Sequence, residues 1–363
     1  MGRNEYEFAL SSICRQGLKE ALADTPVVLI HGPRQCGKTT LARLVGDPLG
    51  YSYFSFDDPV LASAAETDPI GFVDDLPDRA ILDEVQRVPS LFPALKMAVD
   101  RRRVPGRFLL TGSANVMLLP KLSESLAGRI GIIQLHPLAR CELAGKESHF
   151  LDALFAGSFK TQKFERLGKA LAELVADGGY PAALARPNPR RRAAWYRDYV
   201  ETLTQRDVRD LIRIRSLDVL PRLLEHADGQ TARLMNVREL AGPLQVSRTT
   251  IREYLTLLER VFLIEELRRQ ASWSEKDIRF YHFRDKDNFE VDIVLERGAY
   301  DIAGVEVKAS ATVTGADFRG LRKLRDAAIN RFADGLVLYD GETCVSFGDN
   351  LYAVPIRFLW EIV

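Results

Sequence analysis

The sequence predicts an α/β protein in which a parallel β-sheet near the N-terminus is followed by smaller appended domains. Between about residues 25 and 135, short apolar runs alternate with stretches of helical character, which is the pattern of a parallel α/β sheet. Residues 31–40, "HGPRQCGKTT", contain the spacing G-x-x-x-x-G-K-[ST] of a phosphate-binding loop. A chain of 363 residues is also too long for one ordinary core, so two to four domains are expected.

Five strands are expected in the first region, each bounded by Gly, Pro or charged residues. They are the runs "PVVLIH", "YSYFSFD", "RAILDE", "RFLLTGS" and "RIGIIQLH". His136 is followed by a proline, a frequent stop for regular structure. We therefore predict a first domain over residues 1–136.

The rest of the chain divides into three further segments. Residues 137–229 are mainly helical and rich in Ala, Leu and Arg. Residues 230–268 have the pattern of a helix-turn-helix, and Ser247 can cap its second helix. Residues 269–363 return to strands, "IRFYHF", "FEVDIVLE" and "AGVEVKAS", followed by an amphipathic helix and a final strand, "GLVLYD".

Composition places few limits on function. Lysines plus arginines number 50, as do aspartates plus glutamates, so any nucleic-acid surface must come from local clustering. The four cysteines have no paired spacing, which fits a reducing cytosol and argues against structural zinc or a disulfide framework. The N-terminus lacks signal-peptide and myristoylation patterns, and no apolar run approaches the length of a membrane span. We therefore expect a soluble, cytoplasmic protein with no membrane partner.

The loop at residues 32–40 predicts a site for a nucleotide phosphate, because it follows an apolar strand and opens a helix. Its glycines let backbone amides turn towards the β-phosphate, and the helix N-terminus adds positive potential. Lys38 would reach the β- and γ-phosphates, and the Thr39 hydroxyl would ligate Mg²⁺. The expected nucleotide-binding residues are Gly32, Pro33, Arg34, Gln35, Cys36, Gly37, Lys38, Thr39 and Thr40.

Two carboxylates at the end of "RAILDE" have the chemistry that nucleotide hydrolysis needs. Asp83 would hold Mg²⁺, and Glu84 would act as the base that polarises the attacking water. The structural alternative is two solvated acids at the start of the next helix. With the phosphate loop upstream, we favour the catalytic interpretation.

Four further residues of this region have two interpretations each. Ser113, at the end of "FLLTGS", would contact the γ-phosphate and the water, or else belongs to a capped turn. Arg129 would stabilise transition-state charge on its own nucleotide or on that of a neighbouring subunit in a homo-oligomer, or else is an exposed arginine. Asp58 before a proline indicates a helix cap. Cys36 has a pKa lowered by the helix start, or occupies a tolerant position.

The C-terminal strands contain the elements of a metal-dependent phosphodiesterase site. Glu306 and Lys308 are two residues apart on one strand, so their side chains share a face, opposite Val305 and Val307. A hairpin would bring Asp292 beside Glu306, so that the two carboxylates could bind Mg²⁺ with Lys308 near the attacking water. Alternating charge on a half-buried strand is the competing explanation.

The second helix of the helix-turn-helix is a candidate DNA-binding element. Arg248, Thr249 and Arg252 lie away from its apolar stripe and could meet phosphates or base edges in a major groove of duplex DNA. A solvated face of a structural helical hairpin accounts for the same residues.

Several of these motifs occur together and in order. The chain resembles a group of prokaryotic AAA+-type ATPases that carry a C-terminal domain of unknown function similar to the PD-(D/E)XK nuclease fold. The resemblance rests on "GPRQCGKTT", "ILDEVQRVPSLF", "FLLTGSAN", "SLAGRI", "GGYPAAL" and "EVDIVLE…GVEVKAS". It implies an ATP-binding core, a helical lid, a winged helix and a nuclease-like end. Nucleotide binding then falls on Gly32, Gly37, Lys38, Thr39, Asp83 and Glu84.

The chain departs from the family at the junction near residues 264–276, where the segment between the winged helix and the nuclease-like strands is shortened. Two hypotheses of function remain. One is a Mg²⁺-dependent ATPase coupled to duplex DNA through the winged helix and the nuclease-like domain. The other is a nucleotide-gated regulatory module with an inert nuclease-like domain and a protein partner.

Overall fold

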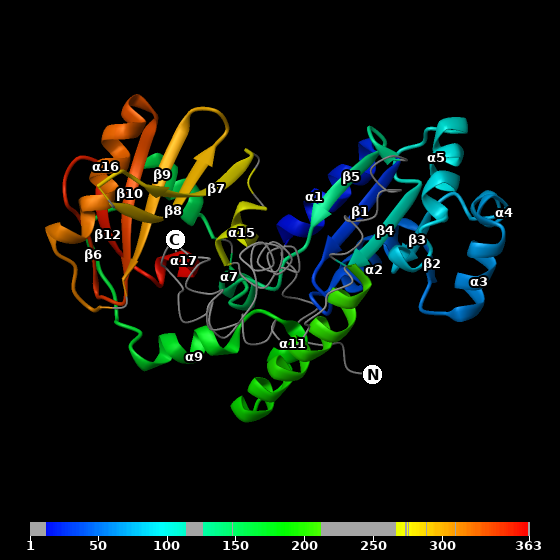
Figure 1. The fold of residues 1–363 in the computed structure, drawn as a ribbon, viewed down its shortest axis with the longest axis horizontal. Helices are drawn as coiled ribbons and strands as arrows, with labels where there is room; N and C mark the ends of the chain where they lie inside the picture. The colour runs from blue at the N-terminus through cyan, green and yellow to red at the C-terminus, as the bar shows by residue number, and fades with distance from the viewer. Residues whose placement is uncertain are drawn as a thin grey trace. The chain divides into compact units, whose positions relative to one another are not determined.

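The computed structural model of the chain describes residues 12–113, 126–146, 148–211, 266–272, 274, 276–287, 289–308 and 310–361. These residues form two compact units (Figure 1). The first takes its described residues from 12–138, 179–211 and 266–269, and the second from 139–178 and 270–361. The predicted DNA-binding residues Arg248, Thr249 and Arg252 lie outside the described residues.

The first unit contains a five-stranded sheet in the order β2-β3-β4-β1-β5. Every pairing between neighbouring strands is parallel. The strands are β1 (Val27–Gly32), β2 (Ser52–Ser55), β3 (Ala80–Asp83), β4 (Phe108–Ser113) and β5 (Ile130–Gln134). All five coincide with the predicted runs, so the parallel α/β class is confirmed. β4 lies between the strand before the phosphate loop and the strand that ends in the carboxylates.

Helices of the first unit pack on both faces of this sheet. They are α1 (Ser12–Asp24), α2 (Lys38–Gly46), α3 (Pro59–Thr67), α4 (Pro69–Asp74) and α5 (Leu91–Arg101), with short 3-10 turns η2 (Asp47–Leu49) and η3 (Val85–Arg87). One core joins strand residues such as Leu29 and Leu82 to Phe92 and Leu95 of α5. The predicted cap Asp58 is confirmed, because its carboxylate accepts the Val60 N–H at 2.8 Å.

The segment predicted as a helical lid is divided between the two units. Its later part, in the first unit, forms α10 (Pro181–Leu184) and the long α11 (Pro189–Leu211). Tyr180, Trp195 and Tyr199 build an aromatic cluster there. Its earlier part, residues 139–178, belongs to the second unit and contains α7 (Arg140–Leu143), α8 (Phe150–Ala156), β6 (Gln162–Lys163) and α9 (Lys169–Asp177).

The second unit contains a seven-stranded mixed sheet in the order β6-β11-β12-β10-β9-β8-β7. Its C-terminal strands are β7 (Ile278–Arg284), β8 (Glu290–Arg297), β9 (Asp301–Lys308), β10 (Phe332–Tyr339), β11 (Thr343–Ser346) and β12 (Leu351–Pro355). β7, β8 and β9 form an antiparallel meander, and β10 pairs in parallel with β9 and β12. The prediction of "GLVLYD" as the final strand was wrong, because β11 and β12 follow it.

Helix α16 (Arg319–Ala328) connects β9 to β10 and packs on this sheet (Figure 1). Its Leu321 and Leu324 share a core with Val291 of β8 and Val337 of β10. The other elements are α15 (Glu266–Ala271), η5 (Gly315–Phe318), η6 (Ile329–Arg331) and α17 (Phe358–Glu361). Within the described ranges, no helix is both long enough and apolar enough to cross a bilayer.

Candidate nucleotide site and a second carboxylate site

The phosphate loop runs from the end of β1 to the start of α2, and its backbone depends on two glycines. A Cβ on Gly32 would lie 2.0 Å from the Leu135 carbonyl oxygen, so no larger residue fits there. Gly37 has φ 103°, a backbone conformation that is open to glycine and rarely taken by other residues. Gln35 also has a positive φ, of 61°. The loop is therefore held in the curved conformation that lets consecutive amides face one ligand.

Lys38 lies inside this loop. Its side chain is 5 % exposed, and Nζ donates to the carbonyl oxygens of Pro33 at 2.7 Å and Gly32 at 3.2 Å. A buried ammonium satisfied only by neutral carbonyls keeps its full positive charge available to an anion. This is the geometry that a phosphate-binding lysine requires.

Asp83 accepts hydrogen bonds from three hydroxyl groups and is 4 % exposed. Thr39 Oγ1 donates to Oδ1 at 2.9 Å, and Tyr53 donates its phenol to Oδ2 at 2.7 Å. Thr111 also donates to Oδ1. The contact between Thr39 and Asp83 joins the two residues that the sequence assigns to Mg²⁺, and their hydroxyl and carboxylate oxygens are ligands of the type that Mg²⁺ prefers.

Sequence analysis missed Tyr53 as a member of this group. Burial, followed by the hydrogen bond to Asp83, raises the pKa of Tyr53 to about 12, so the phenol remains a donor. Tyr53 lies on β2 opposite Ile81, and Ser55 lies opposite Asp83. Only the strand order places Tyr53 beside β3, and local sequence carries no signal for that order.

Glu84 directly follows β3 in a left-handed backbone conformation, with φ 59°. Its N–H donates to Thr111 Oγ1 at 3.3 Å, and the Gln86 amide donates to its carboxylate. Ser113 lies opposite Gly32 in the register of β4 with β1, and its buried Oγ has no hydrogen-bond partner among the described residues. The carboxyl ends of β1, β3 and β4 thus bring the loop, the two acids and Ser113 to one edge of the sheet.

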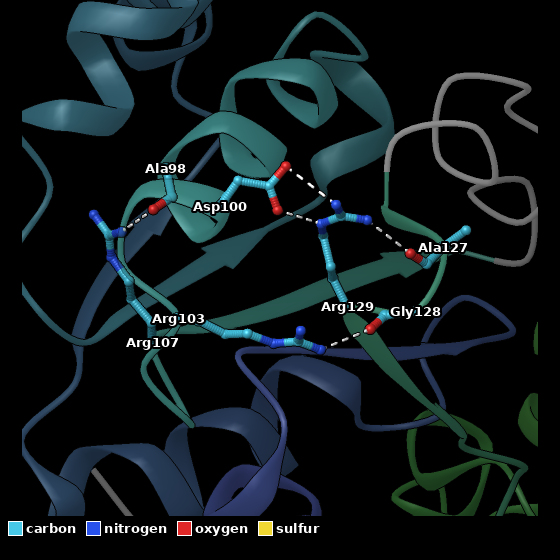
Figure 2. Close-up of polar contacts among 7 residues, drawn as sticks. All are labelled: Ala98, Asp100, Arg103, Arg107, Ala127, Gly128 and Arg129. Carbon is cyan, nitrogen blue, oxygen red and sulfur yellow. Dashed lines mark hydrogen bonds and ion pairs between the residues drawn. The ribbon is translucent and has the colours of Figure 1, made fainter.

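Arg129 does not join them (Figure 2). It precedes β5, whose first residue, Ile130, lies opposite Val27 at the start of β1. That position is roughly 20 Å, the length of the strand, from the loop at the other end of β1. A role for Arg129 on the nucleotide of its own chain is therefore ruled out.

The guanidinium of Arg129 is occupied by a partner that the sequence did not reveal. It forms a two-pronged ion pair with Asp100, through Nε at 2.6 Å and Nη2 at 3.1 Å, and also donates to the Ala127 carbonyl (Figure 2). The ion pair lowers the pKa of Asp100. Arg103 donates to the Gly128 carbonyl at 3.1 Å in the same group.

Cys36 differs from one of its two predicted roles. It is fully buried, and its thiol donates weakly to the Leu135 carbonyl at 3.5 Å. Burial raises the pKa of this thiol, and the opposing effect of Lys38 is smaller. The expectation of a reactive, low-pKa cysteine at the helix start was wrong because desolvation outweighs the helix and the lysine.

The second unit brings Asp292 and Glu306 together as the hairpin prediction required. Ile293 lies opposite Val305 in the antiparallel pairing of β8 with β9, which makes these acids neighbours on adjacent strands. Asp292 Oδ2 also accepts the Val307 N–H at 2.8 Å. Burial, followed by the negative charge of Asp292, raises the pKa of Glu306 to about 8, and Lys308 opposes the shift.

The two faces of β9 differ from the prediction in one respect. Glu306 is 7 % exposed and Val307 is 37 % exposed, although Val307 was expected on the apolar face. The acids therefore lie inside the edge of the sheet rather than on a solvated face. In the described parts of the chain, no group of three or more His, Cys, Asp or Glu side chains is placed to hold a metal ion.

Comparison with known families agrees with this geometry. Residues 24–144 match a family described as an AAA domain. This match, together with the loop and the parallel sheet, supports an AAA+-type ATP-binding domain. Residues 168–285 and 257–359 match two families described as domains of unknown function, DUF8612 and DUF4143. Neither description assigns an activity to the second unit.

Relatives of known sequence add no activity. An uncharacterised protein of Mycobacterium tuberculosis is 35% identical over 253 residues, which are 69% of this chain and 51% of that protein. An uncharacterised protein of Mycobacterium bovis gives the same values. The chain thus spans about half the length of the curated relatives that it matches.

Solved structures resemble the chain only loosely. AMPPCP-bound DnaA from Aquifex aeolicus is 14% identical, with a TM-score of 0.32, and the match covers 71% of this chain and 89% of that one. A RuvB variant from Thermotoga maritima is 20% identical, with a TM-score of 0.30, covering 68% of this chain and 86% of that one. With TM-scores this low, neither likeness carries weight for function.

Proposed function

We propose that the protein is a cytoplasmic, Mg²⁺-dependent ATPase whose nucleotide cycle is coupled to duplex DNA. The observation that supports this best is the hydrogen bond between Thr39 and Asp83 beside the buried Lys38. It joins the three groups that hold Mg²⁺ and the phosphates in phosphate-loop ATPases. The AAA domain match over residues 24–144 supports the same class.

Each residue of the site would have a distinct part in hydrolysis. The amides of the loop and the Lys38 ammonium would bind the β- and γ-phosphates, and Thr39 and Asp83 would hold Mg²⁺, which neutralises charge on those phosphates. Glu84 would accept the proton of the attacking water. Its backbone and carboxylate are both held, by Thr111 and Gln86, which restricts the directions in which it can point. Ser113 Oγ would bond the γ-phosphate or the water.

Coupling to DNA would run through the lid helix. The Tyr199 hydroxyl of α11 donates to the Arg34 carbonyl of the phosphate loop at 3.0 Å, so a change in the loop reaches this helix directly. The chain after α11 leads to the segment that carries Arg248, Thr249 and Arg252. ATP binding would order these parts and hydrolysis would reset them. A homo-oligomer would allow Arg129 to act on a neighbouring nucleotide.

Steady-state ATP hydrolysis at low salt with Mg²⁺, with and without duplex DNA, tests the proposal. We expect turnover that DNA stimulates, loss of turnover in Lys38→Ala, and loss of stimulation alone in Arg248→Ala/Arg252→Ala. Low salt matters because phosphate contacts weaken steeply with ionic strength. Retained turnover in Lys38→Ala would contradict the site assignment. Absent stimulation would favour the regulatory module with a protein partner.

A second candidate function is metal-dependent phosphodiester cleavage by the second unit. The juxtaposition of Asp292 and Glu306 favours it, because two adjacent buried carboxylates repel each other and a divalent cation relieves that repulsion. Lys308 would then assist the attacking water. A DNA cleavage assay with Mg²⁺ or Mn²⁺ tests this, with Asp292→Ala and Lys308→Ala expected to be inactive and Asp326→Ala as an exposed acidic control. Absence of cleavage by the unmodified protein would mean an inert nuclease-like domain.

A further inference from the structure

A cavity of about 190 Å³ lies beside the phosphate loop, within the first unit. The loop contributes Arg34 and Gln35 to its lining. Helix α11 contributes Trp195, Asp198, Tyr199 and Leu203. No role for this cavity follows from the phosphate site itself, since Lys38, Thr39 and Asp83 do not line it.

The wall of the cavity formed by α11 is aromatic and firmly held. The rings of Trp195 and Tyr199 stack with centroids 4.9 Å apart and planes 13° apart, and the Tyr180 ring lies 5.0 Å from Tyr199. Trp195 and Tyr199 are both buried. The hydrogen bond from Tyr199 to the Arg34 carbonyl fixes this wall to the loop. The cavity therefore keeps its shape relative to the phosphate site.

The size and chemistry of the lining suit a heteroaromatic base. An apolar cavity of about 150 Å³ is enough to admit a benzene ring, so this one admits a ring system of comparable or slightly larger size. Aromatic walls bind nucleobases by stacking, and a carboxylate at the rim accepts hydrogen bonds from an exocyclic amino group. Asp198 is an exposed carboxylate in that position.

We propose that this cavity receives the base of the nucleotide whose phosphates occupy the loop, with a preference for an amino-bearing purine such as adenine. The inference rests on the proposed function, because it requires a nucleotide in the loop. Arg34 and Gln35 lie four and three residues before Lys38, so one segment of chain lines both the cavity and the phosphate site. A base bound there would also contact the helix that leads to the predicted DNA-binding segment.

The test compares the affinities of ATP and of inorganic tripolyphosphate for the full chain by titration calorimetry. We expect Trp195→Ala to weaken ATP binding roughly 10- to 100-fold, the loss of one base-stacking contact, and to leave tripolyphosphate binding within about twofold. Trp360→Ala, which removes an indole from the second unit, is the matched control and should change neither affinity. Lys38→Ala should weaken both ligands.

An exposed position keeps the test decisive if Trp195→Ala does not fold. The unmodified protein should bind ATP more tightly than ITP, whose base carries a carbonyl in place of the amino group, and Asp198→Ala should remove that difference. Equal losses of ATP and tripolyphosphate in Trp195→Ala, or no loss of either, would overturn the inference while leaving the ATPase proposal intact. Failure of the unmodified protein to bind either ligand would reject both.

Discussion

Two buried carboxylates, Asp83 in the first unit and Glu306 in the second, lie at the edges of two different sheets with opposite surroundings. Asp83 accepts hydrogen bonds from the hydroxyls of Thr39, Tyr53 and Thr111. Glu306 instead faces a second carboxylate, which raises its pKa to about 8. The contrast teaches that a buried acid is stabilised as an anion where the fold supplies donors, and held partly protonated where it supplies another acid.

This contrast predicts different uses of a metal. At Asp83, a cation would replace hydrogen bonds already aimed at the carboxylate, one of which comes from its own co-ligand Thr39. At Glu306, a cation would replace a proton, so its binding competes with protonation. The first site is therefore organised in advance, and the second is organised by the cation itself.

The largest expected effect comes from Asp83→Asn, which keeps the shape of the side chain and removes its charge. We expect ATP hydrolysis to fall about 100-fold or more, because the metal loses its anionic ligand. Binding of ATP should fall much less, since Lys38 and the loop amides remain. Hydrolysis and equilibrium binding measured on the same preparation distinguish the two effects.

Asp100→Asn is the matched control for this change, because it removes a carboxylate from the opposite edge of the same sheet. Hydrolysis close to that of the unmodified protein is expected. An equal loss of hydrolysis in both variants would mean that charge in general, and not the Asp83 site, governs activity.

The strands of the first site were predictable because burial leaves a continuous apolar signal. All six residues of β1 and all four of β3 are buried, so each run stands out from its polar boundaries. The loop and Asp83 then follow from the strand ends. Tyr53 could not be predicted, because its contact with Asp83 depends on which strand lies beside β3.

The second unit was harder to predict for the same reason. Residues 162–163 form a strand of two residues that pairs with β11, and nothing in so short a stretch signals pairing with a strand 180 residues later. The hairpin of Asp292 and Glu306 was predictable, since strand alternation and a tight turn determine it locally. Arg129 failed because Asp100, its partner, lies on a different element.

The two units should respond to pH in opposite directions. Burial, His136 and Lys38 lower the pKa of His31 to about 4, so the first unit should lose stability as pH falls from about 6.5 towards 4. Burial raises the pKa of Asp334 to about 7, and Glu306 is raised to about 8. Both acids stay protonated in the folded state, so the second unit should lose stability as pH rises from about 4 to 8.

Hydrogen exchange of the β1 and β10 amides at about pH 5 and about pH 8, corrected for intrinsic rates, measures both slopes. Each group contributes at most about 1.4 kcal/mol per pH unit to the free energy of unfolding. Asp334→Asn should flatten the slope for β10, whereas Asp326→Asn, an exposed acid of the same unit, should not. A β10 slope of the opposite sign would contradict the proposed cause.

Tyr53→Phe sharpens the comparison by removing one of the three donors to Asp83. The lost hydrogen bond is worth on the order of 1 kcal/mol, so we expect hydrolysis to fall by a few-fold and not to disappear. The Mg²⁺ concentration that gives half-maximal activity should change as well, since the remaining donors hold the carboxylate less firmly. Tyr51→Phe, whose hydroxyl bonds the Gly106 carbonyl on the same sheet, is the matched control. Equal effects of the two substitutions would show that Tyr53 acts only on stability.

The smallest effect is expected for Arg129→Ala at low protein concentration. Arg129 lies a full strand length from the phosphate loop of its own chain and is paired with Asp100, so hydrolysis by isolated chains should be unchanged. A role on a neighbouring subunit would appear only where chains associate, because the guanidinium must then leave Asp100 for a phosphate of higher charge. Specific activity measured against protein concentration separates these cases, with sedimentation on the same samples to report association. A rise in activity with association that Arg129→Ala abolishes would place the nucleotide site between subunits, and a concentration-independent loss would contradict the strand register.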